Sequence, residues 1–161
     1  MKVEQGKKSM NKNLTLPMPA EALIPHRLPM RLVDTLISWC EDAGEIEATP
    51  GADCILIGSD GALDEAALVE LVAQGYAVIK GYDDLFHGKE ISEGYLVGVK
   101  KFRVTGRAYA GERLLVNIRT VGTFEGFAVA EGKIERAGEV IASGTIKLWV
   151  VSQAAAGGGD R

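Results

Sequence analysis

The sequence has few of the residues that build metal centres and disulfide frameworks. Its 161 residues include two cysteines, Cys40 and Cys54, and two histidines, His26 and His87. The cysteines have neither the spacing of metal ligands nor the number that a disulfide framework needs. We therefore expect reduced thiols in a cytoplasmic protein, with no metal ion and no bound cofactor.

Long apolar runs and excess positive charge are also missing. No stretch of about 18 apolar residues could span a bilayer, and residues 1–13 lack the apolar core of a signal peptide. The net charge is −4, which gives no electrostatic basis for a nucleic acid as the main partner. We expect neither a membrane nor a nucleic acid among the partners.

The composition is that of an ordinary globular protein, with 47% hydrophobic and 25% charged residues. A chain of this length is most simply one domain, which we place at residues 20–152. Residues 1–19 are expected to be disordered. The tail at residues 153–161, rich in alanine and glycine, is expected to be disordered as well.

A helix is predicted over residues 64–80, because good helix formers dominate and two acidic residues stand at its start. Apolar residues lie on nearly every side of it, which predicts burial around most of its circumference. Glu70 is the one carboxylate within the apolar run at residues 66–73. Gly81 is expected to end the helix as the residue just past its last turn.

Strand-like segments flank this helix on both sides. Turns that contain glycine separate them. Two segments come before the helix, at residues 31–40 and 45–49, and four come after it, at residues 95–104, 113–121, 126–135 and 140–150. One helix can be buried so completely against an antiparallel sheet only if the sheet curls around it. The sequence therefore predicts an α+β protein with the hotdog architecture.

Three segments together resemble a known family. Residues 28–34 (LPMRLVD), residues 70–74 (ELVAQ) and residues 94–102 (GYLVGVKKF) are similar to motifs of the hotdog-fold 3-hydroxyacyl-[acyl carrier protein] dehydratases. Asp60 and Gly61, just before the helix, resemble the branch linked to aryl-polyene and related polyketide pathways.

The resemblance implies a substrate that is an acyl thioester on acyl carrier protein or coenzyme A. The reaction would be reversible loss of water from a 3-hydroxyacyl group, in which a helix glutamate and a histidine share the proton transfers across a subunit interface. It also implies a homodimer or larger hotdog oligomer, or a hetero-oligomer with an active dehydratase.

The sequence departs from this family at two positions. The family's catalytic histidine would fall at Leu56, and no histidine is there. The family has Pro-Gly at the start of the helix, where the glycine N–H faces the thioester carbonyl. Asp64 and Glu65 stand there instead, and two carboxylates would oppose a developing oxyanion.

Glu70 and His26 are the candidate catalytic residues. Glu70 could accept a proton or activate water, or it could be a structural carboxylate tied to Gln74 one helical turn away. His26 could reach a neighbouring subunit's site and replace the missing base, or it could anchor its loop by donating to a backbone carbonyl. Both alternatives stay open at this point.

The candidate substrate-binding residues are Gln74, Gly61, Lys100, Lys101 and Arg103. The three cations belong to the densest basic cluster of the folded region, and they could guide an acidic carrier protein or hold a phosphate. They could equally form a solvated strand face. His87 is expected on the surface.

Three functions are therefore compatible with the sequence. The first is a dehydratase-like enzyme of lipid or polyketide biosynthesis. The second is a thioesterase of the same fold that relies on Glu70. The third is a degenerate subunit that partners an active dehydratase or binds acyl chains.

Overall fold

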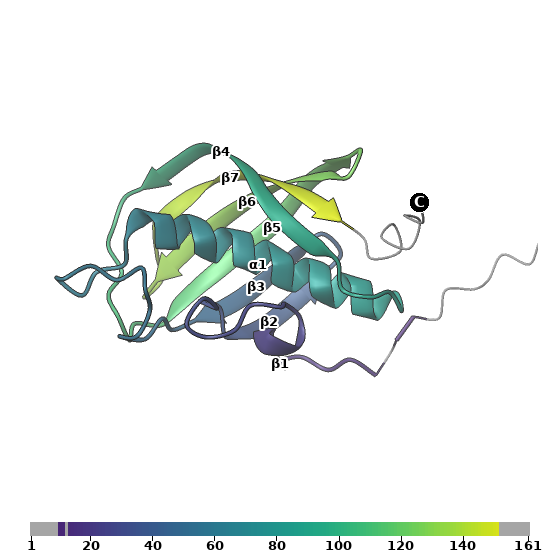
Figure 1. Cartoon of the computed structure of the whole chain (residues 1–161), viewed down its shortest axis with the longest axis horizontal. Helices are drawn as coiled ribbons and strands as arrows, with labels where there is room; N and C mark the ends of the chain where they lie inside the picture. Colours follow the sequence, from purple (N-terminus) through teal and green to yellow (C-terminus); the bar gives the residue numbers. More distant parts are fainter. Residues whose placement is uncertain (1–9, 12, 152–161) are drawn as a thin grey trace, which may run out of the picture.

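The computed structural model describes residues 10–11 and 13–151, and it consists of one long helix and one curled sheet (Figure 1). No helix in this part of the chain has the length and apolar character needed to cross a bilayer. The elements are β1 (Met18–Pro19), the 3-10 turn η1 (Ala20–Ala22), β2 (Thr35–Cys40), β3 (Ala43–Ala48), α1 (Glu65–Phe86), β4 (Glu93–Val104), β5 (Leu114–Phe124), β6 (Phe127–Arg136) and β7 (Glu139–Val151).

The sheet has seven antiparallel strands in the order β1-β2-β3-β5-β6-β7-β4. It curls around α1, which lies across its concave face (Figure 1). This confirms the predicted α+β hotdog architecture. Strand β4 comes directly after the helix in the sequence. It pairs only with β7 among the described strands, so it forms one edge of the sheet.

The helix is buried around most of its surface, as its sequence predicts. Leu71, Val72 and Val78 are fully buried in the core that α1 shares with the sheet. The close approach requires glycine on the sheet. A Cβ added at Gly132 of β6 would lie 2.4 Å from Cγ1 of Val72, which no real structure tolerates.

The predicted end of the helix is wrong. Gly81 lies inside α1, which continues to Phe86 and is capped by His87. Gly81 is required by packing: a Cβ there would lie 2.2 Å from the carbonyl oxygen of Leu23. The last turns are held by Asp84, which is buried, accepts a hydrogen bond from Ser92 N (2.9 Å), and so ties the helix to the start of β4.

The ordered fold begins before residue 20. Met18 and Pro19 pair with Leu36 and Thr35 of β2, and Leu16 packs against the core. Disorder was expected for residues 1–19 and 153–161, and of these residues 1–9, 12 and 153–161 lie outside the described part of the chain.

Strand β4 is irregular near its end. Its pairing with β7 shifts between Lys100 and Arg103, and Lys101 has a positive φ of 54°, which marks a β-bulge. Gly144 of β7 makes room for it, since a Cβ there would lie 2.5 Å from Cδ2 of Phe102. The bulge breaks the side-chain alternation, and all three cations point to solvent.

Candidate functional site

A small cavity of about 80 Å³ lies beside Glu70, between α1 and the edge of the sheet. It is lined from α1, from the loop before β2, from the start of β4 and from β7. The lining residues are His26, Glu70, Ala73, Gln74, Tyr76, Ala77, Lys80, Ser92, Glu93, Gly94, Leu96, Leu148 and Val150. Both candidate catalytic residues therefore line one cavity.

Glu70 is half-buried. Its Oε1 accepts a hydrogen bond from Nε2 of Gln74 at 2.9 Å. Among the described residues, Oε2 has no hydrogen-bond donor. One oxygen thus fixes the orientation of the carboxylate, and the other remains available to a ligand.

Gln74 forms the hydrogen bonds that connect residues around the cavity. It is 1% exposed, and its Oε1 accepts from Leu32 N at 2.8 Å. Its Nε2 donates to the carbonyl of Met30 at 2.9 Å as well as to Glu70. Both donor hydrogens are therefore engaged within the protein, which makes Gln74 a positioning residue for Glu70 and for the segment that leads into β2.

His26 lines the same cavity and carries an unpaired nitrogen. The side chain is half-buried, and Nδ1 is buried without a hydrogen-bond partner among the described residues. Its loop is held by Arg27 instead, whose Nη1 donates to the carbonyls of Ile24 at 2.8 Å and His26 at 2.9 Å. A buried unpaired polar atom costs stability, which is typical of a group kept for a ligand.

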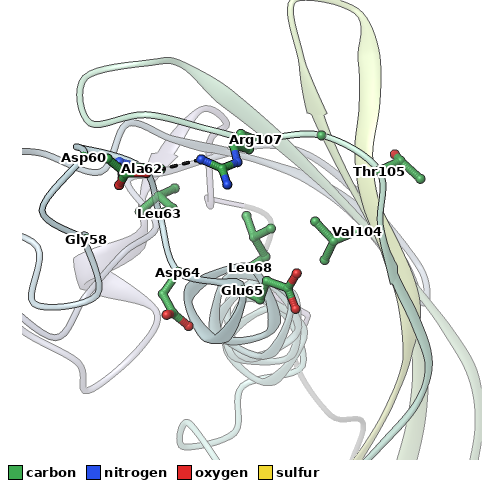
Figure 2. A pocket seen from close by; sticks show the side chains of 11 residues that line it. Gly58, Asp60, Ala62, Leu63, Asp64, Glu65, Leu68, Val104, Thr105 and Arg107 are labelled. Atoms are coloured by element: carbon green, nitrogen blue, oxygen red, sulfur yellow. Dashed lines mark hydrogen bonds and ion pairs between the residues drawn. The ribbon is translucent and has the colours of Figure 1, made fainter.

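A second, larger hollow of about 470 Å³ opens at the N-terminal end of α1. Figure 2 shows Glu65 and Leu68 of α1 opposite Val104, with Asp60 joined to Arg107 above them. The Arg107–Asp60 ion pair spans 3.2 Å, which partly neutralises the charge of Arg107.

Asp64 and Glu65 stand at the start of α1. Asp64 is the N-cap, and its Oδ1 accepts from Ala66 N at 2.8 Å. That N–H is therefore not free to bind a substrate oxygen. Leu56, where the resemblance predicts the family's histidine, packs partly buried against the core.

The predicted substrate-binding cations lie apart from Glu70. Lys100, Lys101 and Arg103 are exposed on β4, and none is among the residues that line the cavity at Glu70. Gly61 has a positive φ of 80°, and its carbonyl accepts from Ala110 N at 3.0 Å. Its role in the structure is to shape the loop before α1.

Two lining residues were not predicted from the sequence, Tyr76 and Lys80. Burial, followed by the charges of Asp84, Asp83 and Asp42, raises the pKa of Tyr76 to about 12. Lys80 forms an ion pair with Asp84 one turn further along α1. The spacing of Lys80 and Asp84 was visible in the sequence, but the position of the cavity beside them was not.

Comparison with known proteins places this geometry in a family. A family model described as ApeP-like, ApeP dehydratase, matches residues 18–156. No curated protein sequence matches the chain. Within the described residues, no group of three or more His, Cys, Asp or Glu side chains is arranged to hold a metal ion.

Solved structures share the fold. A chain of the dehydratase heterocomplex ApeI:P from Xenorhabdus doucetiae is 22% identical, with a TM-score of 0.78 over 85% of this chain and 93% of that one. A hypothetical thioesterase with coenzyme A from Streptococcus pneumoniae TIGR4 is 12% identical (TM-score 0.57, 73% and 85% covered). The protein smu.793 from Streptococcus mutans UA159, bound to acetyl CoA, is 13% identical (TM-score 0.61, 81% and 96% covered).

These findings confirm the resemblance on which the expected activity class was based. The solved structures establish the hotdog fold, and the family model spans nearly all of the described residues. The chain belongs to the ApeP-like dehydratase family.

Proposed function

We propose that the cavity at Glu70 is where a 3-hydroxyacyl thioester, carried by acyl carrier protein or coenzyme A, loses water. One observation carries the proposal: a single cavity is lined by both Glu70 and His26, and Nδ1 of His26 is buried without a hydrogen-bond partner among the described residues. Dehydration needs one group that takes a proton and one that delivers a proton, and these two side chains can do both.

The reaction balances with these two groups alone. One of them takes the proton from C2 of the acyl chain, and the C2–C3 double bond forms as the C3–O bond breaks. The other delivers a proton to the departing hydroxyl, which leaves as water. Gln74 holds the Glu70 carboxylate in place through both steps.

The cavity is too small to hold an acyl chain within one protomer. Its 80 Å³ has room for about two or three water molecules at roughly 30 Å³ each, whereas ligand sites usually span about 300–1,000 Å³. A second subunit beside β4 would enlarge and complete the site. Tyr95, Leu96, Val97 and Val99 support this, because they are exposed apolar side chains on an edge strand.

A second candidate function is the partner subunit of a histidine-bearing dehydratase. Two observations favour it: Leu56 replaces the expected histidine, and a similar chain belongs to a structure described as a dehydratase heterocomplex. In that arrangement Glu70 would supply the carboxylate, and the other subunit would supply the base.

The experiment incubates the purified protein with a 3-hydroxyacyl thioester and, separately, with a saturated acyl thioester. We expect enoyl absorbance from the first and no free thiol from either. Glu70→Gln should lower the rate at least a hundredfold, and His26→Ala should do the same if the histidine acts within the chain. Full activity of Glu70→Gln would refute the site assignment.

The same assay, repeated after co-expression with a histidine-bearing hotdog dehydratase, distinguishes the two candidates. Activity that appears only in the mixed complex, and that falls on Glu70→Gln but not on His26→Ala, identifies the partner role. Thiol release from the saturated thioester would instead identify a thioesterase.

A further inference from the structure

Four aromatic residues form one row across four adjacent strands of the sheet. In the strand register, Phe124 of β5 pairs with Phe127 of β6, and Phe127 pairs with Trp149 of β7. Trp149 in turn pairs with Tyr95 of β4. The chain has only two tryptophans, four tyrosines and four phenylalanines, so the row gathers a large share of its aromatic side chains within about 14 Å.

The row points away from the core. Ala128 and Leu148, the chain neighbours of Phe127 and Trp149, are 1% and 3% exposed and belong to the core that the sheet shares with α1. Successive side chains of a strand point to opposite faces, so Phe127 and Trp149 point to the outer face. Their ring centroids lie 4.6 Å apart. Directly paired residues share a face of the sheet, so the whole row lies on the outer side.

The rings of the row are largely open to solvent. Phe124 is 73% exposed, Tyr95 56% and Trp149 39%. Further along β5 and β6 the outer face is polar, and Arg119 pairs there with Glu131 at 2.6 Å. Polar side chains are what an antiparallel sheet normally turns toward water. An exposed aromatic row on the same face therefore indicates a surface that another molecule covers.

Charged residues of opposite sign flank the row on its two sides. Lys147 stands two positions before Trp149, and its Nζ lies 4.3 Å from the ring centroid of Phe127. Glu93 stands on the other side, and its Oε2 accepts a hydrogen bond from Tyr95 Oη at 3.0 Å. A twofold rotation about an axis along the row exchanges the two sides. Lys147 of each copy then faces Glu93 of the other copy.

We propose that this aromatic row is a contact surface for a second copy of the chain, formed about a twofold axis that runs along the row. The rings supply the apolar area, and the two ion pairs between Lys147 and Glu93 fix the orientation. A charge pattern that is complementary to itself favours a second copy over an unrelated partner. The carboxylate of Glu93 beside the rings disfavours an anionic membrane surface.

This contact is separate from pairing at the edge of β4, because it uses side chains on the outer face and not the backbone of the edge strand. Two separate contacts of this kind on one chain would join at least four subunits. The inference goes beyond the proposed function and does not depend on the reaction at Glu70.

Sedimentation velocity of the purified full chain, over a range of concentrations, tests the surface. Phe124→Asp should weaken self-association about tenfold or more, and its unfolding midpoint should stay unchanged because the ring is mostly exposed in one copy. Val140→Asp is the matched control, since Val140 is 41% exposed near the opposite end of β7 from Trp149. The inference is overturned if Phe124→Asp assembles like the native protein, or if the native protein is a monomer.

A charge exchange tests the orientation and serves as the independent test if Phe124→Asp folds poorly. Lys147→Glu and Glu93→Lys should each weaken the assembly, because like charges then face each other across the contact. The double variant should recover it, and failure to recover overturns the inference. Flotation with anionic phospholipid vesicles examines the other occupant. Vesicle binding that Phe124→Asp abolishes would identify a membrane surface and would overturn the inference as well.

Discussion

Gln74 links residues that stand more than forty positions apart in the sequence. Its side chain bonds Met30 and Leu32 as well as Glu70, so one buried amide holds both the candidate carboxylate and the segment before β2. The loop that carries His26 leads into this segment. The geometry of the cavity therefore depends on a residue whose own hydrogen bonds all stay within the protein.

Gln74→Met should destabilise the protein by about 2–4 kcal/mol. Methionine fills a similar volume but leaves the buried Leu32 N and the partly buried Met30 carbonyl without partners, at about 1–3 kcal/mol for each unsatisfied group. Urea denaturation measures the loss. Gln74→Glu keeps the acceptor for Leu32 N but replaces the donor to Met30 and Glu70 by a carboxylate oxygen, so it should be destabilised as well. Unchanged stability of the methionine variant would contradict the assigned role.

Tyr76 should make the folded state sensitive to alkaline pH. Its pKa is about 12 in the folded protein, above the ordinary tyrosine value of 10.0, so the unfolded chain loses this proton first. The contribution is fully present below pH 10 and is lost as pH rises toward 12. At pH 11 the part that has been lost amounts to about 1.4 kcal/mol of unfolding free energy.

Denaturation of the native protein and of Tyr76→Phe at pH 8 and pH 11 measures this contribution. Between pH 8 and pH 11, the free energy of unfolding should fall by about 1.4 kcal/mol less in Tyr76→Phe than in the native protein. An equal loss in both proteins would mean that Tyr76 titrates normally.

At the scale of single residues, the sequence could predict Glu70 and its hydrogen bond with Gln74, because both follow from local helical spacing. It could not predict that His26 lines the same cavity, since that depends on how a distant loop packs. Tyr76 was not predicted as a cavity residue for another reason. A tyrosine in an apolar helix is most simply a core residue, and only the packed fold reveals a hollow beside it.

At the scale of elements, the length of α1 is decided by packing rather than by local preference. Gly81 favours a helix end, yet the helix continues for five residues. Aromatic contacts stabilise these extra turns. The ring centroid of Tyr82 lies 5.0 Å from that of Trp39 in β2, and the ring centroid of Phe86 lies 5.2 Å from it. The six principal strands, with shorter or longer ends, were predictable because alternation is a local signal.

Gly81→Ala should therefore destabilise the protein by about 1–3 kcal/mol, although alanine is the better helix former. The new methyl would overlap the Leu23 carbonyl, and the 3-10 turn would have to move. Thermal or urea unfolding measures the effect. Gly122→Ala in β5 is the control, because a Cβ there meets nothing within 4 Å and should change stability by less than about 0.5 kcal/mol. A stabilised Gly81→Ala protein would show that α1 can shift away from the turn.

At the scale of the whole molecule, the free edge at β4 should control association. Val99→Asp places a charge in the exposed apolar part of that edge, and it should weaken dimer formation at least tenfold. Val121→Asp is the matched control, since Val121 is similarly exposed on β5, away from this edge. Sedimentation velocity at several concentrations compares the two variants. Equal self-association of both would place the interface elsewhere.

Strand β4 also forms part of both cavities, through Glu93, Gly94 and Leu96 at one end and Val104 at the other. A partner strand along its open edge and a ligand in either cavity would therefore act on the same backbone. Their binding free energies are then coupled, and the coupling is reciprocal. Affinity for a thioester should rise with protein concentration, and a thioester should in turn tighten the assembly. Ligand titrations of this protein have a defined meaning only at a stated subunit concentration.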